Sequence, residues 1–415
     1  MREHAPARAE KGAYRVLLAD DSGTVRHLMR RLLEREPDVR VVGEAEHGRS
    51  AVDLVRQAAA AGKPIEIVLL DVEMPVMDGI LALEHLARVR PAPQVIMLSA
   101  HTRRGAVVTV KALARGASDY VCKPGARSDR DFDSFRQELL TKIRSCGAAL
   151  RSRLEAPPRA AAAVPGSATA KPRQAATPTS TVPRPGPTIP RRMPESSTAR
   201  AAPPRPRPVA AAPRIARRAA GGAFAALAIG SSTGGPQAVL RLLRDLGRLD
   251  RAPVFLTQHM PPAFTAAFAE QIAQELDRPC HEARDGEPVE PGRIYVAPGD
   301  FHMLVRGVPG KAVIALSKDP PENFCRPAVD PMLRSLAAVY RDGLVAVILT
   351  GMGSDGREGC RRVVEVGGRV VVQDKETSVV WGMPGAVVAA GLPATVLPLQ
   401  QIGSHLRKLT DGIRT

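Results

Sequence analysis

The stretch Ile229-Gly-Ser-Ser-Thr-Gly-Gly-Pro236 is the most informative part of the C-terminal half of the chain. It follows the short apolar run 224–229, which predicts a strand, and it precedes residues 237–246, where apolar residues recur at helical spacing. The stretch is therefore predicted to be a tight glycine turn between a strand and a helix. Such a turn exposes a serine at the carboxyl end of the strand, beside the unpaired N–H groups of a helix N-terminus.

Two chemistries fit this turn. A serine hydroxyl beside preorganised N–H donors suits acyl transfer, because the tetrahedral intermediate carries a negative oxygen. The turn is equally compatible with phosphate binding, in which the serine serves only as a helix cap. Short glycine-rich turns do not separate the two readings, so the rest of the chain must decide between them.

Composition bounds the architecture. The chain has 415 residues, which predicts two or three domains, and a formal net charge of +17. Residues 147–222 account for +12 of this charge by count, and 15 of the 38 prolines lie between residues 155 and 215. We therefore expect residues 147–222 to form a disordered basic linker rich in Pro, Ala and Arg. Because no aromatic residues interleave with its basic residues, we expect no specific nucleic-acid partner.

The cysteines and the apolar runs indicate a cellular compartment. Five cysteines lie far apart without a C-x-x-C pair, which favours reduced thiols and argues against a disulfide framework. No apolar run is long enough to span a membrane, and no apolar core follows the basic N-terminus as in a signal peptide. We expect a cytoplasmic protein without a transmembrane segment.

The N-terminal part alternates short apolar runs with amphipathic helical segments, which predicts a parallel sheet with ligands at the carboxyl ends of its strands. The expected strands are residues 14–19, 39–45, 65–70, 95–98 and 118–121, and the expected helices include 22–34, 48–60 and 135–150. The polar residues at the strand ends are Asp20, Asp21, Asp71, Ser99 and Lys123. Three converging carboxylates suit Mg²⁺. A hydroxyl and an ammonium group opposite them suit a phosphoryl group.

Residues 14–140 resemble a response-regulator receiver domain, which has a flavodoxin-like fold. The matching motifs are Asp20-Asp21, Leu70-Asp71-Val-Glu-Met-Pro-Val-Met-Asp-Gly79, Ser99-Ala100 and Lys123-Pro124. The resemblance implies a chemotaxis histidine kinase as phosphodonor and a cis bond before Pro124. The implied roles are phospho-acceptor for Asp71, Mg²⁺ binding for Asp20, Asp21 and Asp71, phosphate partner for Lys123, and switch residues for Ser99 and Tyr120.

The C-terminal part again alternates strands and helices, so we expect a doubly wound parallel sheet over residues 223–415. The expected strands are residues 224–229, 253–257, 293–297, 313–316, 344–349, 369–372 and 393–397, and the expected helices are 237–246, 264–276 and 331–340. Ser232, His259 and Asp355 each follow a strand. A hydroxyl needs a base to become a nucleophile, and the base needs a third group to fix its tautomer. These three side chains supply the three roles.

Other side chains compete for the same roles. His302 and, more weakly, His281 are rival bases, although a lone histidine is more often structural. Asp330 and Asp300 are rival orienting groups, and both also suit turns. Ser231 offers a second hydroxyl, which we expect to be a buried small residue. The Ser–His–Asp chain order and the lack of a G-x-S-x-G elbow disfavour the common α/β-hydrolase fold.

Residues 225–399 resemble the catalytic domain of the chemotaxis protein-glutamate methylesterase family of the CheB type. The matching motifs are Ile229-Gly-Ser-Ser-Thr-Gly-Gly235, Thr257-Gln-His-Met-Pro-Pro262, Val296-Ala-Pro-Gly-Asp300, His302-Met303, Arg326-Pro-Ala-Val-Asp330, Leu349-Thr-Gly-Met-Gly-Ser-Asp-Gly356 and Gly382-Met-Pro384. The resemblance implies Ser232 as nucleophile, His259 as base and Asp355 as the partner of His259. The order of receiver, linker and this domain also matches the family, although the linker is unusually long.

By this resemblance, the chain is a phosphorylation-activated hydrolase of a two-component chemosensory system. It would demethylate glutamate γ-methyl esters on chemoreceptors, and deamidate glutamines there, so that receptor signalling is reset. Backbone N–H groups near Thr233 and Met352 are the oxyanion candidates, and we expect no cofactor in this domain. The alternative is a response regulator whose second domain only docks receptors or a kinase. A DNA-binding output is disfavoured because no helix-turn-helix pattern follows the linker.

Overall fold

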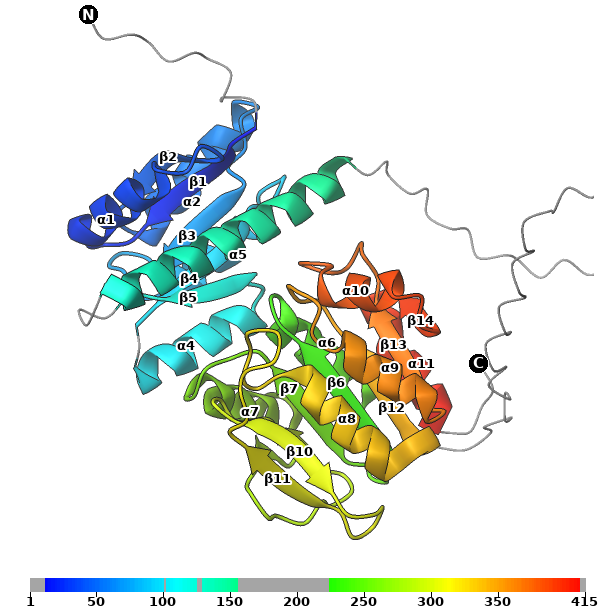
Figure 1. The fold of residues 1–415 in the computed structure, drawn as a ribbon. Coiled ribbons are helices and arrows are strands. Elements are labelled where there is room, and N and C mark those ends of the chain that lie inside the picture. The colour runs from blue at the N-terminus through cyan, green and yellow to red at the C-terminus, as the bar shows by residue number, and fades with distance from the viewer. Residues whose placement is uncertain (1–11, 101, 125–128, 156–223, 411–415) are drawn as a thin grey trace, which may run out of the picture. The chain divides into compact units, whose positions relative to one another are not determined.

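The computed structural model describes residues 12–100, 102–124, 129–155 and 224–410, and these group into one compact unit (Figure 1). The unit contains two parallel α/β sheets, one built from residues 14–122 and one from residues 226–397. Most of the expected linker falls on residues 156–223, which lie outside the described residues.

The first sheet has five strands in the order β2-β1-β3-β4-β5, and every neighbouring pair is parallel. Its strands are β1 (Tyr14–Ala19), β2 (Val39–Ala45), β3 (Ile67–Asp71), β4 (Gln94–Ser99) and β5 (Asp119–Cys122). The helices are α1 (Gly23–Leu33), α2 (Gly48–Ala60), α3 (Gly79–Leu86), α4 (Arg103–Ala114) and α5 (Asp129–Glu155). The order 2-1-3-4-5 confirms the predicted flavodoxin-like fold.

Helix α5 corrects the expected start of the linker. It continues to Glu155, so residues 147–155 are helical and the predicted start at residue 147 is too early. Long-range contacts hold this last part of the helix. The guanidinium of Arg151 donates to both Glu66 oxygens and lies over the ring of Tyr14, 4.2 Å from its centroid. A composition-based boundary could not anticipate partners that are far away in the sequence.

The second sheet has seven parallel strands in the order β14-β13-β12-β6-β7-β9-β8. Its strands are β6 (Ala226–Ser231), β7 (Val254–Gln258), β8 (Cys280–Glu282), β9 (Ile294–Val296), β12 (Leu344–Ile348), β13 (Arg369–Gln373) and β14 (Ala394–Leu397). The helices are α6 (Gly235–Leu246), α7 (Phe264–Leu276), α8 (Val329–Tyr340), α9 (Arg357–Glu365), α10 (Met383–Ala389) and α11 (Leu399–Thr410), and a 3-10 turn η1 (Arg341–Gly343) precedes β12.

The expected strand 313–316 is present but lies outside this parallel sheet. It is β11 (Val313–Ser317), which pairs antiparallel with β10 (His302–Arg306) in a separate two-stranded hairpin (Figure 1). The turn between the two strands is short, and a short connection can join antiparallel strands but not parallel ones.

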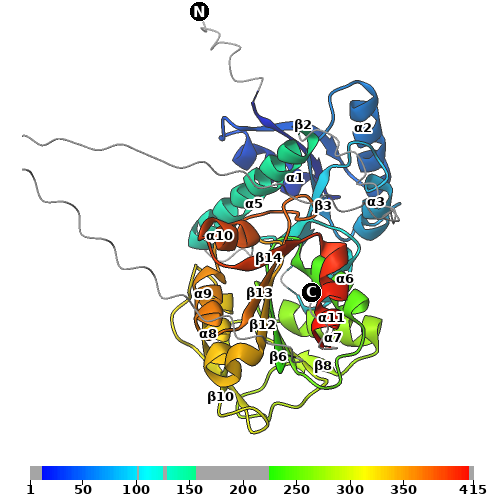
Figure 2. The ribbon, with the colours of Figure 1, turned by 90° about the vertical axis from the view of Figure 1, so that its right-hand side faces the viewer.

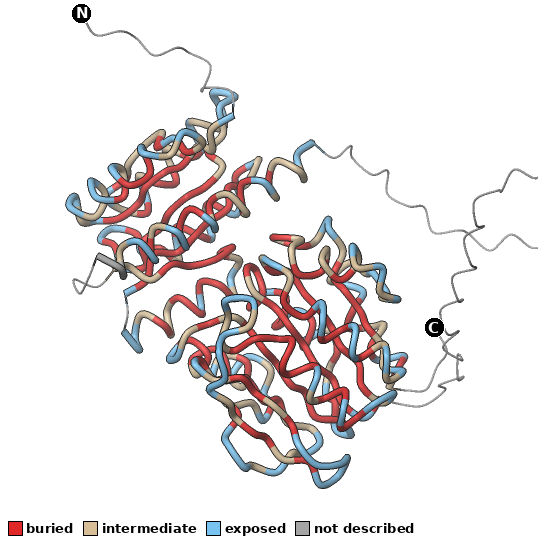
Figure 3. Tube along the Cα trace, in the orientation of Figure 1, coloured by how far each residue is buried: buried red, intermediate tan, exposed pale blue. Residues whose placement is uncertain are grey.

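Helices cover both faces of the seven-stranded sheet, as a doubly wound fold requires (Figure 2). Successive residues of β6 point to opposite faces. Leu227 and Ile229 pack in the cluster that includes residues of α6, α7 and α11, whereas Ala226 and Ala228 pack with α8, α9 and α10. The central strands β6, β7 and β12 are consequently buried along their whole length (Figure 3).

The chain changes direction in this sheet between β6 and β12. From β6 it continues to β7 on one side, whereas β12, β13 and β14 lie on the other side. Ligands of such sheets bind in the crevice at the carboxyl ends of the strands where the order reverses. Ser232, His259 and Asp355 follow β6, β7 and β12, so all three loops border this crevice.

One backbone expectation is wrong. Among the described residues, the cis peptide bonds are Arg90–Pro91 and Arg326–Pro327, so the bond before Pro124 is not cis. With this bond trans, Lys123 still donates its N–H to the Ser99 carbonyl, at 2.7 Å, and brings its ammonium group to the carboxylates. In the part of the chain that the structure describes, no helix is long and apolar enough to cross a membrane.

Candidate functional site

Ser232 lies where strand β6 turns into helix α6. The turn needs glycine at position 234, where φ is 75°. The loop after β12 also approaches it closely, since a Cβ on Gly351 would lie 2.9 Å from the Cβ of Ser232. The Ser232 N–H donates to the Thr350 carbonyl at 3.1 Å, and its carbonyl accepts from Gly235 N at 2.8 Å. These bonds fix the backbone of Ser232, while its side chain is half-buried at the border of the crevice.

Strand pairing brings His259 next to Ser232. Ser231 and Gln258 are partners in the register of β6 and β7, and each is followed directly by one of the two predicted catalytic residues. The His259 N–H donates to the Ser231 carbonyl at 3.1 Å. Sequence spacing alone could not show this, because the two residues come from different strands.

The imidazole of His259 has a different partner on each nitrogen. Nε2 lies 2.8 Å from Asp355 Oδ2, as predicted, and Nδ1 lies 3.4 Å from the sulfur of Cys325. Among the described residues, the Ser232 hydroxyl has no hydrogen bond to this ring. Burial lowers the pKa of His259, but the hydrogen bonds and charges of Asp355 and Cys325 outweigh it and raise that pKa above its ordinary value.

Asp355 is buried and held as a carboxylate by a cage of donors. Its oxygens accept from the N–H groups of Val329 at 2.6 Å, Asp330 at 3.0 Å and Gly356 at 2.9 Å. Burial raises the pKa of Asp355, but His259 and these N–H groups more than offset it and hold the pKa below its ordinary value. A fixed anion at this place can orient the imidazole and stabilise its protonated form.

Asp330 supports this carboxylate but does not replace it. The side-chain amide of Asn323 donates to Asp330 and to Asp355, at 3.1 Å each, and Asp330 also accepts from Gly359 N. Burial, followed by the charge of Asp355, raises the pKa of Asp330 to about 6. Among the described residues, Asp330 has no hydrogen bond to His259, so it remains a neighbour of the orienting group.

The other rivals have structural partners. Both ring nitrogens of His302 meet backbone groups, Pro320 O at 3.1 Å and Ala328 N at 3.2 Å. His281 pairs with Glu287, and Asp300 is exposed in a turn with a φ of 66°. Ser231 is fully buried, as expected.

Sequence reasoning missed three polar residues around the site. Gln258 accepts from the Ser231 hydroxyl at 2.7 Å and donates to the Ser232 carbonyl at 2.9 Å, so it bridges the serine doublet. Gln258 could have been predicted from the sequence, because it lies inside the Thr257–Pro262 motif. Asn323 and Cys325 lie just before the motif 326–330, and they reach the site only through contacts that span 32 and 66 residues.

The two oxyanion candidates are backbone N–H groups without a partner among the described residues, those of Thr233 and Met352. The Thr233 N–H shares its peptide with the Ser232 carbonyl, which accepts from Gly235 N at 2.8 Å and from Gln258 Nε2 at 2.9 Å. The Met352 N–H shares its peptide with the Gly351 carbonyl, which accepts from Met383 N at 2.9 Å. Free N–H groups in fixed peptides are the donors that an oxyanion requires.

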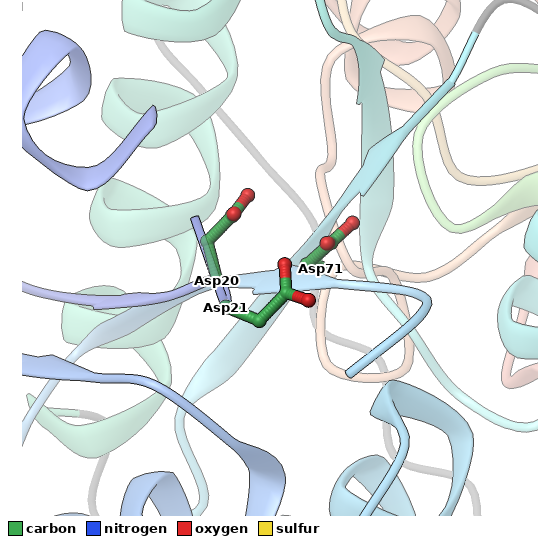
Figure 4. Close-up of side chains that lie close together, drawn as sticks. All are labelled: Asp20, Asp21 and Asp71. Atoms are coloured by element: carbon green, nitrogen blue, oxygen red, sulfur yellow. The ribbon is translucent and has the colours of Figure 1, made fainter. Parts of the chain in front are cut away.

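A second cluster of functional side chains lies at the carboxyl ends of β1 and β3 (Figure 4). Asp20, Asp21 and Asp71 have ligand atoms within 4.8 Å of one another, and Lys123 Nζ lies 2.7 Å from Asp20 and 2.9 Å from Asp71. Burial raises the pKa of Asp71 to about 6, against the opposing effect of Lys123 and with a further increase from Asp20. A single ammonium does not balance three carboxylates, so the donor set fits a divalent cation such as Mg²⁺.

The predicted switch residues lie farther along the same sheet. The Ser99 hydroxyl is buried at the end of β4 and accepts from Thr109 Oγ1 at 2.7 Å. Tyr120 is buried on β5, and its ring stacks on Phe264 of the second sheet's helix α7, with centroids 4.6 Å apart.

Asp119, the first residue of β5, and Ser118 just before it contact the turn that follows Ser232. The Thr233 hydroxyl donates to the Asp119 carboxylate, and Gly234 N donates to the Ser118 carbonyl at 2.8 Å. The hydrophobic cluster that contains Tyr120 and Phe264 continues across both sheets. The edge of the first sheet at β5 is thus in direct contact with the turn after Ser232 and with helix α7.

Both parts of the chain match known protein families. Residues 227–406 match the family model described as CheB methylesterase, and residues 16–130 match that of the response regulator receiver domain. A protein-glutamate methylesterase/protein-glutamine glutaminase from Rhodospirillum centenum is 44% identical over 397 residues, covering 95% of this chain and 94% of the relative. One from Azospirillum brasilense is 42% identical, covering 98% and 96%. The crystal structure of the Thermotoga maritima CheB methylesterase catalytic domain is 41% identical and covers 45% of this chain and 99% of that one, with a TM-score of 0.43.

Proposed function

The chain belongs to the protein-glutamate methylesterase/protein-glutamine glutaminase family, and on that premise we propose that Ser232, His259 and Asp355 hydrolyse glutamate γ-methyl esters on chemoreceptors. The observation that carries the assignment is the position of His259. Its Nε2 is hydrogen bonded to the buried carboxylate of Asp355. It also lies beside Ser232, because Gln258 and Ser231, which directly precede the two residues, are paired in neighbouring strands. Glutamine side chains on the same receptors are the second proposed substrate.

The proposed reaction proceeds through an acyl-enzyme. Ser232 Oγ attacks the ester carbonyl carbon while His259 Nδ1 takes the hydroxyl proton, and Asp355 stabilises the imidazolium. The N–H groups of Thr233 and Met352 stabilise the oxyanion. The imidazolium then protonates the leaving group, which departs as methanol from an ester or as ammonia from glutamine. Water, deprotonated by His259, attacks the acyl carbon. The imidazolium then returns the proton to Ser232 Oγ as the acyl bond breaks, which releases glutamate and free Ser232.

The receiver cluster supports regulation by phosphorylation of Asp71 by a histidine kinase. Asp20, Asp21 and Asp71 would hold Mg²⁺, which supplies charge neutralisation for a phosphoryl group when it is bound. Lys123 contacts Asp71 at 2.9 Å and would pair with the phosphate. Ser99 would bind the new phosphate oxygens, and Tyr120 would move with it.

Contacts of β5 with the serine turn support inhibition before phosphorylation. Asp119 accepts from Thr233, the residue after the nucleophile, and Ser118 accepts from Gly234. In this proposal the unphosphorylated receiver restricts access to Ser232. A shift of Tyr120 away from Phe264 would loosen these contacts and admit the substrate.

The deciding experiment measures methanol release from methylated receptor fragments with and without a small phosphodonor and Mg²⁺. We expect release by the wild type to need Ser232, and to rise with the phosphodonor only when Asp71 is present. The variants are Ser232→Ala and Asp71→Asn. If the wild type released no methanol under any condition, the proposed substrate would be wrong, and labelling of Ser232 by a serine-reactive probe would show whether the nucleophile is functional.

A further inference from the structure

Residues 322–325 form a tight turn beside the catalytic base. Glu322 N donates to Cys325 O at 3.1 Å, and Cys325 N donates to Glu322 O at 2.9 Å. Asn323 and Phe324 therefore form a two-residue loop between two paired residues. Both loop residues have positive φ, 51° at Asn323 and 62° at Phe324. Such turns favour Asn followed by Gly, because glycine adopts this backbone without strain.

Asn323 fits its position, but Phe324 does not. Asparagine tolerates the left-handed region, and the side chain of Asn323 also bonds to Asp330 and Asp355. A bulky aromatic residue in this region is strained. Packing does not compensate for the strain, because the Phe324 side chain is fully exposed, at 102% of its reference area. Neither the backbone nor the core therefore accounts for phenylalanine here.

The turn is held firmly in place. The two terminal guanidinium nitrogens of Arg334 on α8 donate to the carboxylate of Glu322, at 2.9 and 2.5 Å. On the other strand of the turn, the sulfur of Cys325 lies 3.4 Å from His259 Nδ1. The backbone of Phe324 is thus fixed between a residue that touches the orienting carboxylate and one that touches the base. Strained residues persist where the surroundings hold them, and they concentrate at functional sites.

We propose that Phe324 is a substrate-docking residue that packs on an apolar side chain of the receptor helix, near the glutamate whose ester is cleaved. This inference rests on the proposed function. A glutamate γ-methyl ester on a helix surface is small, and the side chains three and four residues away lie beside it. An aromatic ring standing out of the enzyme next to the base can reach such a neighbour. Exposed aromatic residues are typical anchors of protein–protein contacts.

The test compares a receptor substrate with a small ester in the full-length, phosphorylated chain. Phe324→Gly removes the ring and relieves the backbone, so its melting temperature should equal or exceed that of the wild type. We expect its KM for the methylated receptor fragment to rise about tenfold, as for the loss of a modest anchor, with kcat retained. Turnover of p-nitrophenyl acetate should stay the same, because this ester has no helix to present to Phe324. Phe324→Trp, which keeps an aromatic ring, should have the same KM for the receptor fragment as the wild type.

The matched control is Val308→Ala, which shortens another exposed apolar side chain in the turn between β10 and β11. It should change neither KM nor kcat. An unchanged receptor KM in Phe324→Gly would overturn the proposal. So would an equal loss on both substrates, because that would mean that the residue acts through the catalytic groups. Failure of the proposed function itself would look different: wild-type turnover of the receptor fragment would be absent or independent of Ser232.

Discussion

The sulfur of Cys325 lies 3.4 Å from Nδ1 of His259, the ring nitrogen that is not bonded to Asp355. In the proposed reaction this nitrogen takes the proton of Ser232, and the sulfur can then accept a hydrogen bond from the N–H of the imidazolium, which favours the charged ring. We propose on this ground that Cys325 is a positioning residue of the base.

Cys325→Ala should shift the pH profile of hydrolysis to lower pH. The contact with Cys325 raises the pKa of His259, and the base acts only when its imidazole is neutral. The rate therefore rises as pH rises through the pKa of His259, and removing a group that raises this pKa moves the midpoint down. The loss of one hydrogen bond of typical strength should lower this midpoint by about 0.5 to 1 pH unit.

The measurement for Cys325 is kcat/KM against pH, which reports the free enzyme. Cys280→Ala, a change at a cysteine of strand β8 away from the base, is the control and should leave the midpoint in place. An identical midpoint in wild type and Cys325→Ala would mean that the thiol does not influence the base.

The serine doublet should separate into a structural and a catalytic residue. The buried hydroxyl of Ser231 donates to Gln258 at 2.7 Å, so Ser231→Ala should cost about 1 kcal/mol of unfolding free energy while hydrolysis continues. Ser232→Ala should abolish acyl-enzyme formation without a comparable loss of stability. Denaturant unfolding and turnover, measured on both variants, check the assignment, and the reverse pattern would exchange the two roles.

Asp119→Ala should raise the hydrolytic activity of the unphosphorylated chain. The change removes the acceptor of the Thr233 hydroxyl, and losing a hydrogen bond worth about 1 kcal/mol shifts a two-state equilibrium about fivefold toward the open form. Activity with the phosphodonor should change less, because the contact would already be released in that state.

The control for Asp119 is Glu138→Ala. Lys142 contacts both carboxylates, at 3.1 Å and 2.7 Å, but Glu138 has no bond to the Thr233 hydroxyl. Equal activation by both variants would trace the effect to Lys142 and not to the contact with the serine turn.

Asp21→Asn should weaken Mg²⁺ binding at least tenfold and slow phosphorylation of Asp71 accordingly, because a charged oxygen ligand becomes neutral. Asp21 is exposed, so the fold should tolerate the change. Phosphate incorporation titrated against Mg²⁺ is the measurement. Basal hydrolysis without a phosphodonor should equal that of the wild type, and a parallel drop in basal hydrolysis would point to general damage.

Much of the fold follows from local patterns. Apolar runs that alternate with amphipathic segments predict parallel sheets, and the carboxyl ends of parallel strands meet at one edge. Ser232, His259 and Asp355 could be selected for this reason, since each follows such a run. Local patterns could not exclude His302 as the base, because the backbone groups that occupy its two ring nitrogens belong to Pro320 and Ala328, which are 18 and 26 residues away in the sequence.

Local sequence patterns suffice to predict two α/β sheets, the residues at their carboxyl edges and the basic character of the segment between them. The partner of each His259 nitrogen, and the exposure of Phe324 on a strained turn beside the base, can be seen only in the folded chain. The two kinds of feature differ in the range of the interactions that produce them. Strand and helix patterns arise from neighbours a few residues apart, whereas Cys325 reaches His259 across 66 residues, through loops whose paths depend on the packing of the whole sheet.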